Sequence, residues 1–202
     1  ATAENLDEKG ETTSSIAKRN GAVAAINAGG FYDANGTGTG RSPYGFIIHD
    51  GKFILGQNVA DGEVNEFVGL TDDGNLIAGN YSKGELISMD VKEGISFGPA
   101  LIVNGERMIT SGDGGWGVGP RTAIGQKKDG TVLFLVIDGR QPSYSIGATL
   151  RDVQNILYEE GAYIAANLDG GSSSTLYMNG NVVNKPADLL GERMIPTAFI
   201  VK

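Results

Sequence analysis

Short β-prone runs, separated by Asp-Gly and Asn-Gly pairs, dominate the pattern of apolar and polar positions along the chain. Four segments show the pattern: "GFIIHDGKFILG", "FVGLTDDGNLIAG", "ALIVNGERMI" and "STLYMNGNVVN". These pairs accept the positive φ angles of the tight turns that join antiparallel strands. The pattern therefore predicts that most of the protein is antiparallel sheet.

Two segments follow the spacing of a helix instead. The first spans about residues 14–20 in "TTSSIAKRNG", with hydroxyl caps before it and Gly21 after it, and it leads into the apolar strand "AVAAIN". The second begins after the capping residue Thr149, places Leu150, Val153, Ile156 and Leu157 on one face, and ends at Gly161. We expect a short helix at each place.

The second helix lies between two apolar runs, residues 131–137 and 162–168. A strand, helix, strand unit of this length normally forms a right-handed crossover between parallel strands, so both strands end at the same edge of the sheet. Asp138-Gly139-Arg140 follows the first run and Asp169-Gly170-Gly171 follows the second. The pattern predicts an α+β fold: a mixed, largely antiparallel sheet, rich in hairpins, with one βαβ crossover and a second short helix.

Length and composition favour a single domain over residues 1–202. The 32 glycines, about twice the usual share of ~7%, indicate many turns and close backbone approaches. Because the net charge is −8 and the basic residues are scattered, we expect neither nucleic acid nor an anionic membrane surface as a partner. The absence of cysteine excludes disulfides and thiolate metal sites.

The ends of the chain suggest a piece of a longer protein. No apolar run approaches the ~20 residues that span a bilayer, and the start, "ATAENLDEKGE", has no signal-peptide pattern. The chain also begins without methionine. We therefore expect an excised domain that makes no membrane contact itself.

Asp138 and Asp169 are the candidate catalytic residues. Asp-Gly pairs often mark simple turns, as we expect at three other positions inside hairpins. The context of Asp138 and Asp169 differs, because each follows a buried strand, at the edge where open α/β sheets bind ligands. Paired carboxylates serve glycoside hydrolysis, one as acid and the other as base or nucleophile.

The polar corner, which we define as Gly170 to Ser174, does not match known nucleophile or phosphate motifs. A serine-hydrolase elbow requires glycine where Ser174 stands, together with a histidine later in the chain, and the only histidine, His49, lies far upstream where a surface turn is expected. A P-loop would require a lysine and a following helix. The corner is therefore either a polar turn or a set of small donors for an anionic oxygen or sugar hydroxyls.

Three further features leave alternatives open. The segment 33–45 begins like a calcium loop, but Tyr44 stands where the bidentate glutamate belongs, so we favour a glycine-rich loop over an EF-hand. Trp116, in the glycine-rich segment 110–120, either stacks on a sugar ring or folds back as a local plug. Arg121 either clamps a phosphate or pairs with a surface acid, and we favour the clamp.

Four blocks in order, "INAGGFYD", "FGPALIVNGE", "RTAIGQKKDGTVLFLVIDGRQPSYSIGATLRDV" and "ANLDGGSSSTLYMNGNVVN", resemble the phosphodiester glycosidase family. The resemblance extends from about Ser14 to the last residue. It implies hydrolysis of a sugar-1-phosphodiester to free sugar and a phosphomonoester. It also implies a set of site residues: Asp169 and Asp138 as catalytic residues, and Arg121, Arg140, Asn27, Gly30, Gly170, Gly171, Ser173 and Ser174 as substrate-binding residues.

The resemblance also implies a setting. We expect a small or polymeric sugar phosphodiester as partner, no required cofactor, and an extracellular or cell-surface location in a bacterium, reached through an export segment that this chain lacks. Two other functions stay open: a binding module for a cell-wall glycan or phosphate polymer, and a hydrolase that uses a divalent cation such as calcium. The sequence identifies neither the sugar nor the aglycone.

Overall fold

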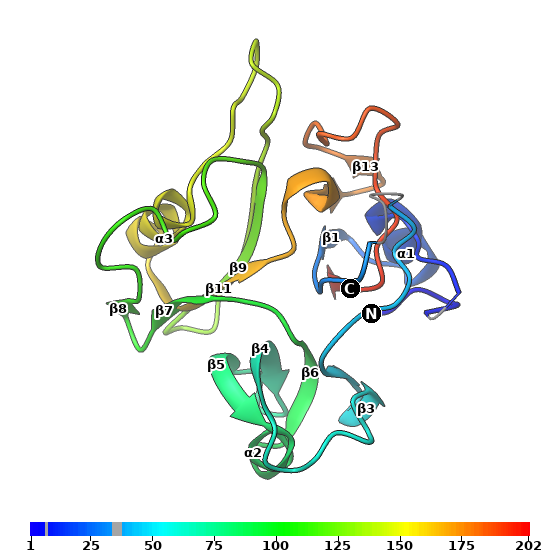
Figure 1. The fold of residues 1–202 in the computed structure, drawn as a ribbon, viewed down its shortest axis with the longest axis vertical. Coiled ribbons are helices and arrows are strands. Elements are labelled where there is room, and N and C mark those ends of the chain that lie inside the picture. Colours follow the sequence, from blue (N-terminus) through cyan, green and yellow to red (C-terminus); the bar gives the residue numbers. More distant parts are fainter. Residues whose placement is uncertain (7, 34–37) are drawn as a thin grey trace.

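The computed structural model of the chain describes residues 1–6, 8–33 and 38–202, and within these residues it contains three sheets (Figure 1). The first has the strand order β13 (Asn181–Val182), β12 (Leu176–Met178), β1 (Ala24–Asn27) and β14 (Ala198–Val201). The second has the order β10 (Val132–Ile137), β9 (Arg121–Lys127), β11 (Ala162–Leu168), β7 (Ala100–Val103) and β8 (Glu106–Arg107). The third has the order β3 (Lys52–Leu55), β2 (Ile47–His49), β6 (Val91–Ile95), β4 (Val64–Thr71) and β5 (Leu76–Ser82).

The four predicted hairpins are confirmed. The pairs β2–β3, β4–β5, β7–β8 and β12–β13 are all antiparallel. In three of the turns the residue before glycine has a left-handed backbone, with φ of 51° at Asp50, 53° at Asn104 and 48° at Asn179. Because Asp and Asn tolerate this conformation better than most residues, the turn sequences specify the hairpins locally.

The predicted crossover is also confirmed. β10 and β11 each pair antiparallel with β9, so they are parallel to each other with β9 between them. α3 (Leu150–Glu159) connects them, and a capping box between Thr149 and Asp152 starts the helix as the sequence suggests. The apolar face of α3 packs on this sheet in a buried cluster. As a result, β10 and β11 end at the same edge, on either side of the start of β9.

The other helices are short. α1 (Thr13–Arg19) begins after the capping residue Thr12 and confirms the first predicted helix. α2 (Lys83–Ser88) is an additional helix that the sequence analysis did not predict. It has a capping box between Ser82 and Glu85, but its six residues are too few to show an apolar repeat. No helix within the described residues is long and apolar enough to cross a membrane.

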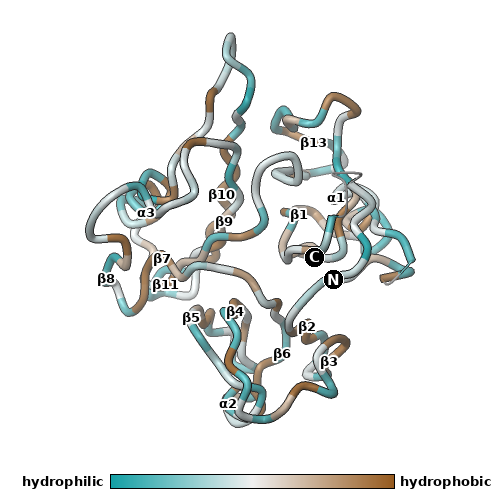
Figure 2. Tube along the Cα trace, in the orientation of Figure 1, coloured by the Kyte–Doolittle hydropathy of each residue, from teal (hydrophilic) through white to brown (hydrophobic). Residues whose placement is uncertain are grey.

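One central core joins the three sheets. In Figure 1 the three sheets surround a middle region. Buried side chains from all three sheets pack together in one cluster. Figure 2 shows that apolar segments run mainly along the strands, whereas the outer loops are more hydrophilic. The core includes Ile26, Ile47, Val68, Leu76, Ile95, Ile124, Leu168 and Phe199. Because strands from all parts of the chain share this core, the sheets fold as one unit.

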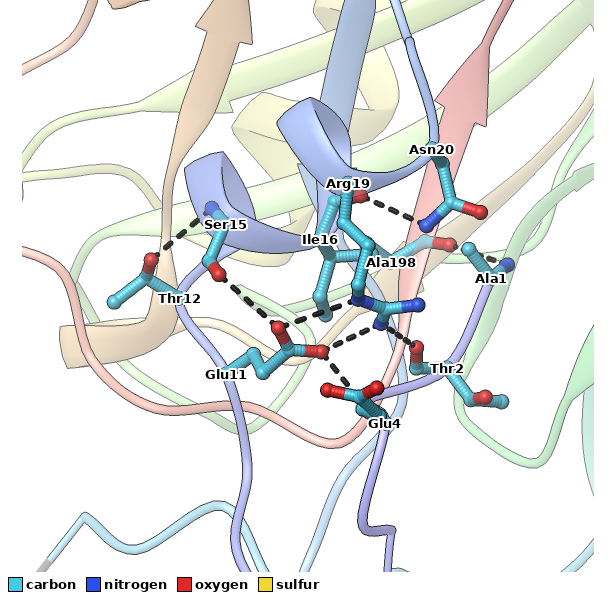
Figure 3. Close-up of polar contacts among 10 residues, drawn as sticks. All are labelled: Ala1, Thr2, Glu4, Glu11, Thr12, Ser15, Ile16, Arg19, Asn20 and Ala198. Atoms are coloured by element: carbon cyan, nitrogen blue, oxygen red, sulfur yellow. Dashed lines mark hydrogen bonds and ion pairs between the residues drawn. The ribbon is translucent and has the colours of Figure 1, made fainter.

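The start of the chain is fastened to α1 and β14 by polar contacts (Figure 3). The Ala1 amino group donates to the carbonyl of Ala198. The Arg19 guanidinium donates to the Thr2 carbonyl and to the Glu11 carboxylate. Glu11 also accepts from the Ser15 hydroxyl and the Glu4 N–H. Glu11 is therefore the acceptor that holds this end of the chain on the helix.

Glu11→Gln is expected to lower the free energy of unfolding at pH 7 by about 1 kcal/mol. Burial alone would raise the pKa of Glu11, but hydrogen bonds from Arg19, Glu4 and Ser15 outweigh it and the pKa is lowered. The stabilisation is therefore present above the ordinary carboxyl pKa and is lost as pH falls through the folded-state value. Urea unfolding at pH 7 and pH 3 measures it. Glu159→Gln, at an exposed position, is the control, and an equal loss in both variants at pH 7 contradicts the prediction.

Candidate active site

Asp169 lies where two sheets meet. It directly follows β11, whose last residue, Leu168, pairs with Thr122 of β9. Its N–H donates to the Ala28 carbonyl at 2.9 Å, and its carbonyl accepts from Asn27 Nδ2 at 2.5 Å. Figure 1 shows the following turn, in orange, between β9 and β1. The backbone of Asp169 is thus held from both sides by the segment that ends β1.

The Asp169 carboxyl has an unusual protonation equilibrium. Burial raises its pKa from the ordinary value of 3.8 to about 6, although hydrogen bonds from the Ser173 hydroxyl and the Gly170 N–H lower it in part. By solvent exposure the residue is half-buried rather than sealed. A carboxyl with a pKa near neutrality at the end of a buried strand is typical of a functional group.

Asn27 holds the backbone that carries this carboxyl. Its side chain is fully buried. Its Oδ1 accepts from the Thr122 hydroxyl at 2.8 Å and from the Thr175 N–H at 3.1 Å, while its Nδ2 holds Asp169. These contacts join β1, β9 and the end of the polar corner. Asn27 therefore positions Asp169, and direct contact between Asn27 and substrate stays a prediction.

The polar corner is a compact turn against the start of β9. Its centre is the 3₁₀ helix η2 (Gly171–Ser173), where Gly171 has φ 60° and donates its N–H to the Pro120 carbonyl at 2.9 Å. A Cβ at Gly170 would approach that same carbonyl to 2.9 Å, which explains the glycine. Ser173 and Ser174 are buried, and the Ser174 hydroxyl has no hydrogen-bond partner among the described residues.

Two arginines lie beside the corner. Arg121, the first residue of β9, is buried, and it donates from Nε to the Ala148 carbonyl at 3.0 Å and from Nη2 to the Trp116 carbonyl at 3.1 Å. Arg140 is exposed, and its guanidinium lies 3.1 Å from where a Gly171 Cβ would be. Burial lowers the pKa of Arg121, and the charge of Arg140 lowers it further. In the described part of the chain, neither arginine forms an ion pair with a carboxylate. The guanidinium charges at this edge are therefore not neutralised by direct pairing with a carboxylate of the described residues.

The Asp138 carboxylate accepts hydrogen bonds from three protein groups. Its Oδ1 accepts from Asn184 Nδ2 at 2.8 Å, and its Oδ2 accepts from the Lys185 N–H at 3.0 Å and from the Tyr144 hydroxyl at 3.1 Å. Asn184 Nδ2 also donates to the Ser174 carbonyl at 3.1 Å. These contacts tie the end of β10 to the polar corner. They fit a positioning residue, and a catalytic role for Asp138 stays a prediction.

The separation of the two aspartates follows from the strand order. Because strands lie about 4.8 Å apart and β9 separates β10 from β11, the strand ends that carry Asp138 and Asp169 are expected about 10 Å apart. A common cleft for the two carboxylates stays a prediction.

Sequence reasoning missed the aromatic residues around Asp169. A Cβ at Gly30 would lie 2.1 Å from the Tyr44 hydroxyl and 2.7 Å from the Phe97 ring, so both rings pack against the glycine backbone. Burial and then the charge of Asp169 raise the pKa of Tyr44 to about 12. The sequence analysis treated Tyr44 only as the residue that breaks a calcium-loop pattern. Gly30 was the available signal, because a glycine outside a turn often marks a close approach.

The calcium-loop comparison gains no support. The Asp33 carboxylate pairs with Arg193 and accepts from the Gly38 N–H, while the other candidate positions, Asn35 and Thr37, lie outside the described residues. Over residues 1–6, 8–33 and 38–202, no three His, Asp or Glu side chains gather as a metal site. His49 is exposed, with Nδ1 2.9 Å from Glu93, which confirms its predicted surface position.

Comparisons with known proteins agree on one family. The model of the phosphodiester glycosidase family matches residues 20–202. The uncharacterized protein YomE, derived from the SPbeta prophage of Bacillus subtilis, is 32% identical over 197 residues, which are 94% of this chain and 29% of YomE. The N-acetylglucosamine-1-phosphodiester alpha-N-acetylglucosaminidase of Bos taurus is 26% identical over 203 residues, covering 91% of this chain and 36% of the enzyme.

A solved structure gives the same result. The catalytic domain of the zebrafish N-acetylglucosamine-1-phosphodiester alpha-N-acetylglucosaminidase superposes with a TM-score of 0.77 and 26% identity, covering 95% of this chain and 67% of that structure. The chain spans about a third of the length of the curated relatives that it matches.

Proposed function

The chain belongs to the phosphodiester glycosidase family, and from this premise we propose that it hydrolyses the glycosidic bond of a sugar-1-phosphodiester, releasing free sugar and a phosphomonoester. One observation carries the proposal. Asp169, whose pKa is raised to about 6, lies at the same sheet edge as two arginines that have no carboxylate partner in the described residues. Hydrolysis of a sugar phosphodiester at the sugar needs both a carboxylate for the anomeric centre and a positive charge for the phosphate.

The arginines are proposed to bind the phosphate. Because the whole protein is acidic, with a net charge of −8, attraction for an anion has to be local. A guanidinium offers paired N–H donors that match phosphate oxygens. The phosphomonoester is a good leaving group, so holding its charge matters more than protonating it.

Asp169 is proposed to act at the sugar. Cleavage of a glycosidic bond passes through an oxocarbenium-like transition state, and a nearby carboxylate stabilises its positive charge or attacks the anomeric carbon. Asp138 was also a candidate from sequence, but its hydrogen bonds to three protein groups favour a role in positioning the polar corner. Asp169 is therefore the proposed catalytic carboxylate, and the anomeric outcome is left to experiment.

The pH dependence of kcat/KM follows from this role. Asp169 must be ionised, and burial raises its pKa to about 6. We expect kcat/KM to be half-maximal near this pH and to fall about tenfold for each further pH unit below it. Initial rates between pH 4 and 8, with far-UV circular dichroism to confirm folding, measure the profile. A flat profile down to pH 4 contradicts the assignment.

A panel of sugar-1-phosphodiesters tests the proposed function. The purified protein is incubated with diesters that differ in sugar and aglycone, and free sugar is measured with and without a chelator. Release of free sugar in both conditions supports the proposal. Binding without release supports a glycan-binding or phosphate-binding module, and release that the chelator stops supports a divalent-metal hydrolase. An exported location, in contact with cell-surface polymers, stays an expectation.

A further inference from the structure

Four aromatic side chains form a continuous row beside Asp169. The rings of Tyr32 and Tyr44 meet edge to face at 5.5 Å between centroids, Tyr44 stacks on Phe97 at 6.4 Å, and Phe97 meets Trp116 edge to face at 6.0 Å. The four residues come from three separate segments of the chain. The row therefore exists only in the folded protein, because no single loop contains all four rings.

The middle of the row is tied to the backbone around Asp169. Tyr44 and Phe97 pack on Gly30, two residues after Ala28, whose carbonyl accepts the Asp169 N–H. Phe97 precedes Gly98, whose carbonyl accepts from Asn167 Nδ2 at 2.8 Å, two residues before Asp169. These contacts fix the row next to the carboxyl.

The far end of the row is tied to the proposed phosphate site. The Trp116 carbonyl accepts from Arg121 Nη2 at 3.1 Å. One end of the row therefore lies beside an arginine without a carboxylate partner among the described residues, and its middle lies beside Asp169. A ligand on the row would meet an aromatic face, a carboxylate and a positive charge together.

The row is open to solvent although it is apolar. Tyr32 is 69% exposed, Trp116 is 51% exposed and Tyr44 is 36% exposed, whereas Phe97 between them is 9% exposed. Exposed aromatic rings that the fold does not need for its core are typical of binding surfaces. Phe97 serves as the packed base that keeps the other rings in register.

We propose that Tyr32, Tyr44, Phe97 and Trp116 form the platform on which the sugar ring of the substrate stacks, with its anomeric carbon turned towards Asp169. The inference rests on the proposed function and adds the sugar subsite to it. A pyranose has an apolar C–H face and a polar rim, so it matches aromatic rings bordered by polar groups. A flat lipid or peptide surface would not require the carboxylate and arginines at the border of the row.

The chain provides its own probe of this platform, because Trp116 is its only tryptophan. Tryptophan emission, excited selectively over that of the seven tyrosines, therefore reports on the row alone. Hexose-1-phosphates of several configurations are titrated into the Asp169→Asn variant, which prevents turnover, and inorganic phosphate is titrated in parallel. We expect hexose-1-phosphates to quench or shift the emission much more than inorganic phosphate does, because only the sugar ring stacks on the row.

Variants separate the row from the rest of the surface. Tyr32→Ala removes an exposed ring and is expected to weaken hexose-1-phosphate binding about tenfold. Tyr158→Ala, at an exposed tyrosine of α3, is the control and leaves binding unchanged. Equal responses to sugar phosphates and inorganic phosphate, or undiminished binding by Tyr32→Ala, overturn the platform.

The same variants distinguish this inference from the proposed function. Hydrolysis of phosphodiesters with an unchanged KM in Tyr32→Ala overturns the platform and leaves the function standing. Binding of hexose-1-phosphates on the row without hydrolysis of any diester supports the platform and overturns the function.

Discussion

Asp169→Asn is expected to lower turnover of a sugar-1-phosphodiester by about 100- to 10,000-fold, the range over which a positioned carboxylate contributes to catalysis. Asparagine keeps the size of the side chain and removes its charge. The backbone contacts of Asp169 with Ala28 and Asn27 do not depend on the side chain, so the sheet edge should keep its shape.

The same substitution is expected to stabilise the fold at neutral pH. Burial raises the pKa of Asp169 from 3.8 to about 6, so the folded state binds the proton more tightly than the unfolded chain. Above pH 6 the folded protein carries an unfavourable charge that asparagine removes, a gain of up to about 3 kcal/mol in the free energy of unfolding. As pH falls through 6 the carboxyl is protonated in the folded state, and the gain disappears below about pH 4.

Kinetics and urea unfolding of the same preparation test both effects. Asp129→Asn is the matched control, because Asp129 also precedes a glycine but lies in an exposed hairpin turn. Asp138→Asn is a second comparison and should lose stability, since its carboxylate holds the segment at Lys185. Near wild-type turnover by folded Asp169→Asn would show that Asp169 is a turn residue.

Arg140→Gln is expected to reduce kcat/KM on sugar phosphodiesters by about ten- to a hundredfold, the value of one lost hydrogen bond to a charged group. The Arg140 side chain is exposed, and its one hydrogen bond within the described residues is a long contact, 3.5 Å, to the Ser172 hydroxyl, so its loss should not disturb folding. Arg121→Lys keeps the charge at the buried position but loses the paired N–H donors of the guanidinium, and it should also lower kcat/KM on phosphodiesters.

The discriminating measurement for Arg140 compares two substrates. An aryl glycoside of the same sugar has no phosphate, so any activity on it should change little in Arg140→Gln. Arg107→Gln, at another exposed arginine, controls for the loss of one positive charge. Equal losses on the phosphodiester and the aryl glycoside would remove the phosphate role of Arg140.

The fold was predictable from sequence where its determinants are local. Asp50, Asn104 and Asn179 each adopt the left-handed backbone before a glycine, so the hairpins are specified within a few residues. The crossover was predictable because Thr149 and Asp152 cap α3 between two apolar runs. The six-residue helix α2 was missed, since one turn and a half of helix leaves no periodic signal.

The candidate site was predictable only in part. Asp138, Arg140 and Asp169 stand next to glycines after strands, and Arg121 begins a strand after Pro120; that position alone selects them. The contacts that distinguish the roles of these residues come from parts of the chain that are distant in sequence. Asn184 donates to the Asp138 carboxylate across 46 positions. Tyr44 packs on Gly30, a contact that the local propensity of neither residue predicts. The aromatic row likewise depends on how three sheets meet at one core, which is a tertiary property.

The site of bond cleavage tests the central claim most directly. Hydrolysis of a sugar-1-phosphodiester in water enriched in oxygen-18 distinguishes cleavage of the sugar C–O bond from cleavage of the P–O bond. A phosphodiester glycosidase that uses Asp169 at the anomeric carbon places the label in the released sugar and none in the phosphomonoester. Label in the phosphate product, whether that product is sugar-1-phosphate or the phosphomonoester released beside unlabelled sugar, would contradict the account.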